Sequence, residues 1–137
     1  REEPVVVIET PALTAQTEEL AARLRALAPE TPTLWQGDRA VRCPAADILR
    51  FYAEDKGVFA QLTDGQVCAV QLRLYELEEQ LDRHTFVRIS HSEIINLKRV
   101  TALDLSITGT IKMTLTGGTV CYASRRYVKK IKEAAGL

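Results

Sequence analysis

The sequence predicts a mainly β protein, because short runs of strand-forming residues recur along it between turn signals. Eight to ten such runs follow one another at a spacing of roughly ten residues, and they are rich in β-branched and aromatic residues. Gly37-Asp38, Asp64-Gly65 and Thr116-Gly117-Gly118 are turn sequences that separate neighbouring runs. Only a few segments carry the leucine spacing of an amphipathic helix instead.

Residues 1–33 are predicted to form an N-terminal βα extension. Residues 4–9, PVVVIE, are apolar and largely β-branched and are expected to form a strand. Residues 14–28 follow with helical leucine spacing, and the sequence PETP at residues 29–32 ends that helix, since proline interrupts both helix and strand pairing. A domain boundary is therefore expected here, with the second domain spanning residues 34–137.

In the first half of the second domain, polar turns separate five expected strands. These strands cover residues 33–36, 39–43, 47–53, 58–63 and 66–71. The segment LRLYELEEQLD that follows predicts a short amphipathic helix over residues 72–82, since Leu74, Leu77 and Leu81 keep helical spacing.

The second half predicts further strands and a terminal helix. The strands cover residues 86–90, 100–105, 110–115 and 119–123. The segment HSEIINLKRV at residues 91–100 is ambiguous and is expected to be a loop with a helical turn. The final helix is expected over residues 126–134, with Ser124 as its N-cap and Gly136 as its stop.

The charge of the chain is divided between its two halves. The whole chain is neutral, with 18 Lys+Arg against 18 Asp+Glu. Residues 1–85 hold 9 Lys+Arg and 15 Asp+Glu, net −6, and residues 86–137 hold 9 and 3, net +6. Such a split indicates a surface for a polyanion, although solvated charged faces are its commonest explanation.

The sequence gives no support to several other classes of protein. Cys43, Cys68 and Cys121 are odd in number and dispersed, which favours buried thiols over disulfides or a zinc site. No run of 18 apolar residues and no signal-peptide pattern occur, so a cytoplasmic protein is expected. A Gly-rich phosphate loop, a helical pair of metal-binding histidines and a nucleophile elbow are also missing, so we expect no enzyme, no cofactor and no small-molecule substrate.

Four short polar segments suggest binding to a nucleic acid. They are EDKG at residues 54–57, RISHS at 88–92, NLKR at 96–99 and YASRRYVKK at 122–130. Arg forks onto guanine and Asn onto adenine, while Ser, Tyr and Lys hold phosphates. For Lys129, Lys130 and Lys132 the alternative is that they complement the negative end of the terminal helix dipole.

Two long motifs, FVRISHSEIINLKRV and YASRRYVKKIKE, resemble the LytTR (LytR/AlgR-type) DNA-binding domain family. The shared pattern is an aromatic residue, Arg, a polar-polar-Ser step, an Ile/Val-Asn pair, basic residues and a Ser-Arg-Arg-Tyr helix start. Its members here are Phe86, Arg88, Ser90, His91, Ser92, Ile95, Asn96, Lys98, Arg99, Ser124, Arg125, Arg126 and Tyr127. Ser90 and His91 depart from many relatives, which have His and then Asn or Arg at these positions. The resemblance covers about residues 34–136.

The resemblance implies about ten short strands in three small antiparallel sheets. It also implies that loops, rather than a recognition helix, enter successive major grooves and bend the DNA. It implies base contacts by His91 and Arg126 and, more loosely, by Lys56. Together with the polar segments, it implies phosphate contacts by Arg88, Ser90, Ser92, Lys98, Arg99, Tyr122, Ser124, Arg125 and Lys129.

The resemblance also implies partners. The 33 residues before the second domain are too few for a receiver domain, so a stand-alone bacterial transcriptional regulator is expected. Double-stranded DNA with paired direct-repeat sites is the expected ligand, bound by a homodimer that forms at least on DNA. Stand-alone members are often held inactive by a small membrane protein.

Three alternatives stay open. The protein could be an interaction module that docks an acidic or membrane-bound partner through the same basic surface or through the N-terminal βα unit. The stripe of Leu20, Leu24 and Leu27 could pack on the protein's own sheet or serve dimerisation. Because Cys121 is next to Tyr122, oxidation of an exposed thiol in this cationic setting could block DNA binding.

Overall fold

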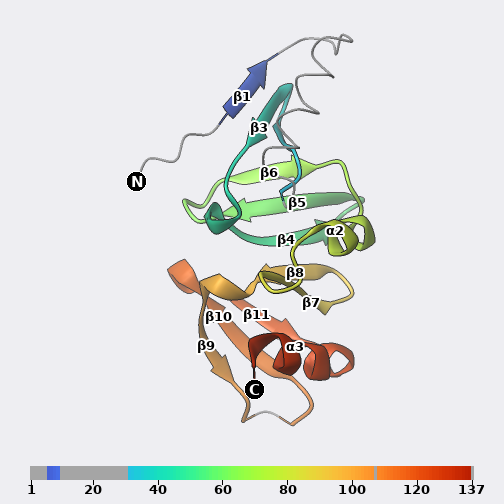
Figure 1. Ribbon diagram of the computed structural model, residues 1–137, viewed down its shortest axis with the longest axis vertical. Coiled ribbons are helices and arrows are strands. Elements are labelled where there is room, and N and C mark those ends of the chain that lie inside the picture. The colour runs from blue at the N-terminus through green and yellow to red at the C-terminus, as the bar shows by residue number, and fades with distance from the viewer. Residues whose placement is uncertain (1–5, 10–30, 107, 137) are drawn as a thin grey trace.

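The computed structural model describes residues 6–9, 31–106 and 108–136, and this part of the chain is mainly β, as the sequence predicts (Figure 1). The predicted strands are confirmed, with ends that differ by no more than two residues. The strands are β1 (Val6–Glu9), β2 (Leu34–Gln36), β3 (Arg39–Arg42), β4 (Ile48–Glu54), β5 (Gly57–Leu62), β6 (Val67–Val70), β7 (Phe86–Ser90), β8 (Glu93–Asn96), β9 (Val100–Asp104), β10 (Ile111–Leu115) and β11 (Val120–Ala123).

The described strands form two antiparallel sheets, so the expectation of three is wrong. The larger sheet has the order β1-β3-β2-β6-β5-β4-β8-β7, and the smaller has the order β11-β10-β9. The cause is the seven-residue strand β4, which pairs with β5 on one side and with β8 on the other. This strand joins hairpins that would otherwise form separate small sheets.

The ambiguous segment at residues 91–100 contains a strand that the sequence pattern does not reveal. The predicted helical turn is present as the 3-10 helix η2 (Leu97–Arg99), but β8 precedes it. Ile94 and Ile95 of β8 lie in two different apolar clusters, one on each face of the sheet. A strand buried on both faces does not alternate between apolar and polar residues, so periodicity cannot identify it.

Both helices predicted after residue 33 are present. Helix α2 (Leu74–Gln80) begins with the Arg73 N–H donating to the Glu76 carboxylate at 2.8 Å. Helix α3 (Val128–Ala135) follows the 3-10 turn η4 (Arg125–Tyr127) and ends at Gly136, whose φ of +78° is left-handed. Ser124 caps η4 only through its backbone, as its carbonyl accepts from Tyr127 N–H at 2.9 Å and its side chain makes no cap hydrogen bond.

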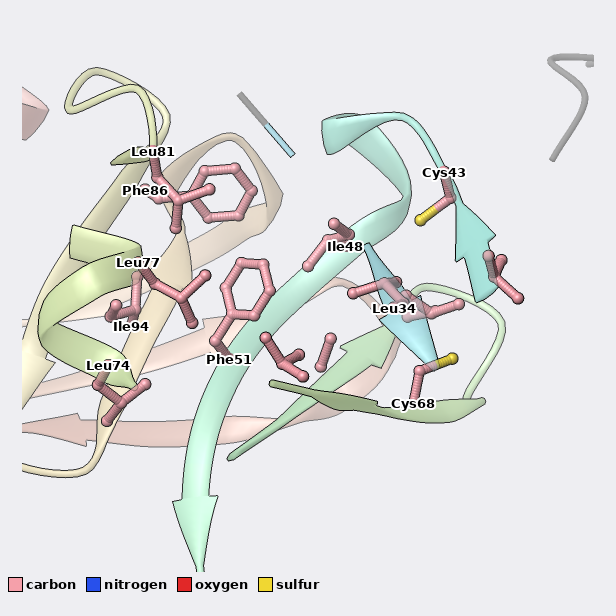
Figure 2. Close-up of a cluster of buried hydrophobic side chains, with 14 residues drawn as sticks. Leu34, Cys43, Ile48, Phe51, Cys68, Leu74, Leu77, Leu81, Phe86 and Ile94 are labelled. Carbon is pink, nitrogen blue, oxygen red and sulfur yellow. The ribbon is translucent and has the colours of Figure 1, made fainter. Parts of the chain in front are cut away.

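The larger sheet is covered on both faces where β4, β8 and β7 pair. On one face, α2 contributes Leu74 and Leu77 to a cluster that contains Phe51 and Phe86, whose ring centroids are 5.5 Å apart (Figure 2). On the other face, the smaller sheet and α3 enclose a second cluster. That cluster holds Leu49, Val87, Ile89, Ile95, Ile111, Met113, Leu115, Cys121, Ala123 and Ile131. Figure 1 shows the smaller sheet and α3 at the end of the molecule away from β1.

The described part of the N-terminal extension is a strand of the larger sheet. β1 pairs antiparallel with β3, from Val6 opposite Arg42 to Glu9 opposite Arg39. The predicted helix at residues 14–28, with its leucine stripe, lies outside the described residues. The division at residues 33 and 34 therefore stays a prediction.

Candidate nucleic-acid interface

Three polar segments that are far apart in the sequence meet at one end of the strands of the larger sheet. They are the β4–β5 hairpin tip with Lys56, the β7–β8 turn with His91 and Ser92, and the start of η4 from Ser124 to Arg126. We call them together the loop edge. Ala53 N–H donates to Ser92 O at 2.9 Å, and Ser124 N–H donates to Ile89 O at 2.9 Å. The turn with His91 therefore lies between the other two segments, and Lys56, His91 and Arg126 are all exposed.

The hairpin tip presents Lys56 from a constrained backbone. Asp55 and Lys56 both have positive φ, +52° and +84°, which matches the type I′ turn that suits a two-residue hairpin. Lys56 and His91 line one groove, together with Arg88 and the acidic Glu54 and Asp55. The groove is thus of mixed charge beside the hairpin, so negative charge opposes phosphate binding at this point.

Arg88 holds the turn that carries His91. Its Nε donates to Ser90 O at 2.7 Å, its Nη2 to His91 O at 2.7 Å, and its Nη1 to Glu78 Oε1 at 2.9 Å. Only 11% of the Arg88 side chain is exposed. The Ser90 hydroxyl also accepts from Ser92 N–H at 3.2 Å. The structure therefore directs the guanidinium of Arg88 to protein acceptors, while His91 and Ser92 face solvent.

Strand β11 brings Tyr122 to the loop edge by crossing the larger sheet. The Gln61 amide on β5 donates to the Thr119 hydroxyl at 3.4 Å, the Cys121 thiol to the Glu93 carboxylate on β8 at 3.0 Å, and Ser124 N–H to Ile89 O on β7. Cys121 and Ala123 point into the core, whereas Tyr122 is 56% exposed.

The start of the terminal helix presents a row of cationic side chains. Arg125, Arg126 and Lys129 are exposed. The Arg125 guanidinium lies so close over Gly109 that a Cβ added there would come within 2.7 Å of Nη2. Arg125 and Lys129 line a shallow groove with Lys132.

Lys98 and Arg99 lie away from the loop edge. They belong to η2, which follows the C-terminal end of β8, while the His91 turn precedes its N-terminal end. Arg99 Nε donates to Ala46 O at 2.8 Å, and Lys98 N–H donates to the Asn96 side chain at 2.9 Å. The structure does not bring these two cations together with His91.

The alternative of an exposed, reactive Cys121 is wrong. The residue is 3% exposed, and burial, together with the neighbouring Glu93 carboxylate, raises the pKa of its thiol to about 12. A thiol with that pKa holds its proton at neutral pH and is a poor nucleophile. Cys43 and Cys68 are buried as well, and all three are free, so the prediction of buried thiols is confirmed.

One residue at the site, Glu78, could not be predicted from the sequence. Glu78 accepts hydrogen bonds from Arg88 and from Lys130, whose Nζ lies 2.8 Å from Glu78 Oε2. These partners are 10 and 52 residues away in the chain. Glu78 has the appearance of an ordinary solvated helix acid, so no local signal marks it.

Within residues 6–9, 31–106 and 108–136, no group of three or more His, Cys, Asp or Glu side chains is placed to hold a metal ion. None of the described helices has both the length and the apolar character needed to cross a membrane.

These features define a class of protein: a mainly β domain that presents cationic and polar side chains from turns and a helix start. The family model for the LytTr DNA-binding domain matches residues 38–136, and the chain belongs to this family. The solved LytTr DNA-binding domain from Bacillus cereus is similar in fold, with a TM-score of 0.71 at 21% sequence identity, over 77% of this chain and 95% of that one.

Relatives from Staphylococcus aureus are named uncharacterized HTH-type transcriptional regulators. Those from strains COL and MW2 are 46% identical to this chain over 92 residues, and that from strain MRSA252 is 44% identical. The match covers 67% of this chain and 61% of each relative. The chain therefore matches about three fifths of the length of these relatives.

The described residues do not contain the helix pair that the name HTH-type denotes. Helices α2 and α3 are separated by residues 81–127, which form five strands. A helix-turn-helix protein places its second helix in the major groove. Here the exposed candidate residues come from turns and from the start of η4.

Proposed function

We propose that this chain is a sequence-specific transcriptional regulator that binds double-stranded DNA through the loop edge. The observation that carries the proposal is that three polar segments meet at one end of the strands of the larger sheet, within a LytTr DNA-binding domain. The net charge of +6 in residues 86–137 supports it, since neutralised phosphates supply most non-specific affinity.

The candidate residues divide into three roles. Lys56, His91 and Arg126 are proposed to contact base edges, because they are exposed and lie on the three segments of the loop edge. Phosphate contacts are proposed for Ser90, Ser92, Tyr122, Ser124, Arg125 and Lys129, with Lys98 and Arg99 reaching phosphates further along the duplex. Arg88 is assigned to support of the turn, because its donors already have protein acceptors.

The finer features of binding are part of the same proposal. The separate segments would enter successive major grooves and bend the duplex, and two copies would occupy direct repeats about one helical turn apart. Residues 1–33 are proposed as a βα extension of the binding domain at residues 34–137. We propose no catalytic activity and a cytoplasmic location.

In vitro selection from a random duplex library tests the proposal. At about 150 mM salt, purely electrostatic binding is suppressed, so a specific binder enriches a defined motif. Two enriched motifs about one helical turn apart would support paired binding. A folded, pure protein that enriches nothing would overturn sequence-specific recognition.

Base contact by Arg126 has its own test. The variant Arg126→Ala should lose about 1–3 kcal/mol of binding free energy and relax the preference at one base pair. The measurement is affinity for the selected duplex and for its single-base variants. An equal loss on every duplex would make Arg126 a phosphate contact.

The second candidate function is docking of an acidic protein partner on the same cationic surface. The exposed row of Arg125, Arg126 and Lys129 favours it, because carboxylates bind Arg as phosphates do. An inhibitory membrane protein is one partner of this kind. Failure of the selection experiment would favour this candidate.

A further inference from the structure

We propose that Glu78 of α2 is a positioning residue for DNA recognition, which fixes the His91 turn and the start of α3 relative to each other. The inference rests on the proposed DNA-binding function. It concerns a residue that neither the polar segments nor the family motif includes.

Glu78 is connected to the His91 turn through Arg88. Arg88 binds the carbonyl oxygens of Ser90 and His91, both at 2.7 Å. A guanidinium has a planar, forked set of donors, so two fixed carbonyls and one carboxylate determine its orientation. Glu78 Oε1 supplies that carboxylate at 2.9 Å. Without this carboxylate, only the two carbonyl oxygens orient the guanidinium.

Glu78 is also connected to α3, the helix that follows Arg126. The other carboxylate oxygen, Oε2, accepts from Lys130 Nζ at 2.8 Å. Lys130 lies on α3, four residues after Arg126. One carboxylate therefore joins Arg88, which holds the His91 turn, to α3, which follows Arg126, with one oxygen for each. We call Arg88, Glu78 and Lys130 the clamp.

The electrostatic state of Glu78 suits this role. Partial burial favours the neutral acid, but the hydrogen bonds and positive charges of Lys130 and Arg88 outweigh it and lower the pKa of Glu78. The carboxylate is therefore ionised at neutral pH. Helix α2 is anchored in the core by Leu74 and Leu77, so Glu78 stands on a fixed support.

The simpler explanation is that Glu78 forms an ordinary surface ion pair. That explanation predicts the opposite change in DNA affinity when Glu78 is neutralised. Such pairs contribute little to stability, and Lys130 is 54% exposed. If Glu78 were only a surface acid, its neutralisation would leave DNA affinity unchanged or raise it, because a negative charge near a polyanion is removed. Positioning predicts that the same neutralisation weakens specific binding.

The experiment measures affinity for the selected duplex and for a scrambled duplex at about 150 mM salt. In Glu78→Gln, the ratio of the two affinities should fall about tenfold, while affinity for the scrambled duplex stays constant or rises. Glu79→Gln is the matched control, since Glu79 is an exposed neighbour that forms no ion pair with any described residue. That control should keep the wild-type ratio.

A second variant tests the clamp at Arg88. Arg88→Lys keeps the charge but lacks the fork that spans two carbonyls and a carboxylate. It should lower the same ratio, and the double variant should be no worse than Arg88→Lys alone, because residues that act together are not additive. Additive losses, or a Glu78→Gln ratio equal to that of Glu79→Gln, would overturn the inference. So would equal losses on both duplexes with a lower melting temperature.

A measurement without DNA separates this inference from the proposed function. Hydrogen exchange of the Ser92 amide should be several-fold faster in Glu78→Gln than in wild type or Glu79→Gln, because the turn loses its support. If the wild-type chain selects no duplex, the proposed function fails, but the exchange rates still show whether Glu78 holds the turn. Unchanged exchange would overturn the clamp.

Discussion

The His91 turn and the Lys56 hairpin tip are neighbours at the loop edge, yet they are held in different ways. The hairpin tip is determined by local backbone conformation, since Asp55 and Lys56 both adopt positive φ. The His91 turn is determined by side chains, since Arg88 joins the carbonyls of Ser90 and His91 to the Glu78 carboxylate on helix α2. One recognition segment is thus encoded locally, and the other depends on the packing of α2 and β7.

This difference implies that the two segments respond to different kinds of substitution. A locally encoded turn responds to substitutions within the turn itself and keeps its shape when distant elements change. A turn held by charged side chains responds to changes in residues that never approach the DNA.

The largest effect is expected for Arg88→Ala, which removes the support of the His91 turn. Two carbonyls lose a charged donor, so the free energy of unfolding should fall by about 2 kcal/mol. Specific DNA affinity should fall at least as much as in His91→Ala, because the displaced turn misplaces both His91 and Ser92. Denaturant titration and duplex binding measure the two quantities. Wild-type binding by Arg88→Ala would show that the turn keeps its shape unaided.

Lys56→Gly should weaken DNA binding without lowering the stability of the protein. Glycine adopts the φ of +84° at this position without strain, so unfolding free energy should stay constant or rise by up to about 1 kcal/mol. Loss of the ammonium group should lower specific affinity about tenfold. Lys56→Asn is the control, because asparagine also tolerates positive φ and lacks the charge. If both variants bind as wild type does, Lys56 has no role in base contact.

Asp55→Asn should strengthen DNA binding without altering the hairpin. Asparagine tolerates the φ of +52°, so the turn keeps its shape, while one negative charge beside Lys56 is removed. Affinity should rise about two- to fivefold at low salt, with a smaller gain at high salt because the charges are screened. A gain that does not depend on salt would contradict this electrostatic explanation.

The smallest effect is a pH dependence of the His91 turn. The pKa of Glu78 is lowered in the folded protein from its ordinary 4.5, so its stabilising contribution is present above that value and is lost as pH falls through the folded pKa. The protection of the Ser92 amide, which is its exchange rate compared with that of an unfolded chain at the same pH, should therefore fall in acid more steeply in wild type than in Glu78→Gln. Asp82 and Asp104 also have lowered pKa values, and both proteins share them, so the comparison isolates Glu78.

Much of the fold could be predicted because it is encoded locally. Turn sequences such as Gly37-Asp38 and Asp64-Gly65 mark hairpins, and the leucines of residues 72–82 mark α2. Strand β8 could not be predicted, because burial of Ile94 and Ile95 on opposite faces removes the alternation that marks a strand. The number of sheets also depended on a long-range pairing, that of β4 with β8.

The sequence by itself determined the mainly β class, the positions of several hairpin turns and of the two helices after residue 33, and the polar segments that carry Lys56, His91 and Arg126. Periodicity, turn chemistry and charge lie within short stretches of chain, so these features are readable there. Only the tertiary structure decided that the three segments meet, that Arg88 turns towards Glu78, and that Cys121 is buried. Those outcomes depend on pairing and packing between residues far apart in the chain, and no local pattern records which distant partner a side chain meets.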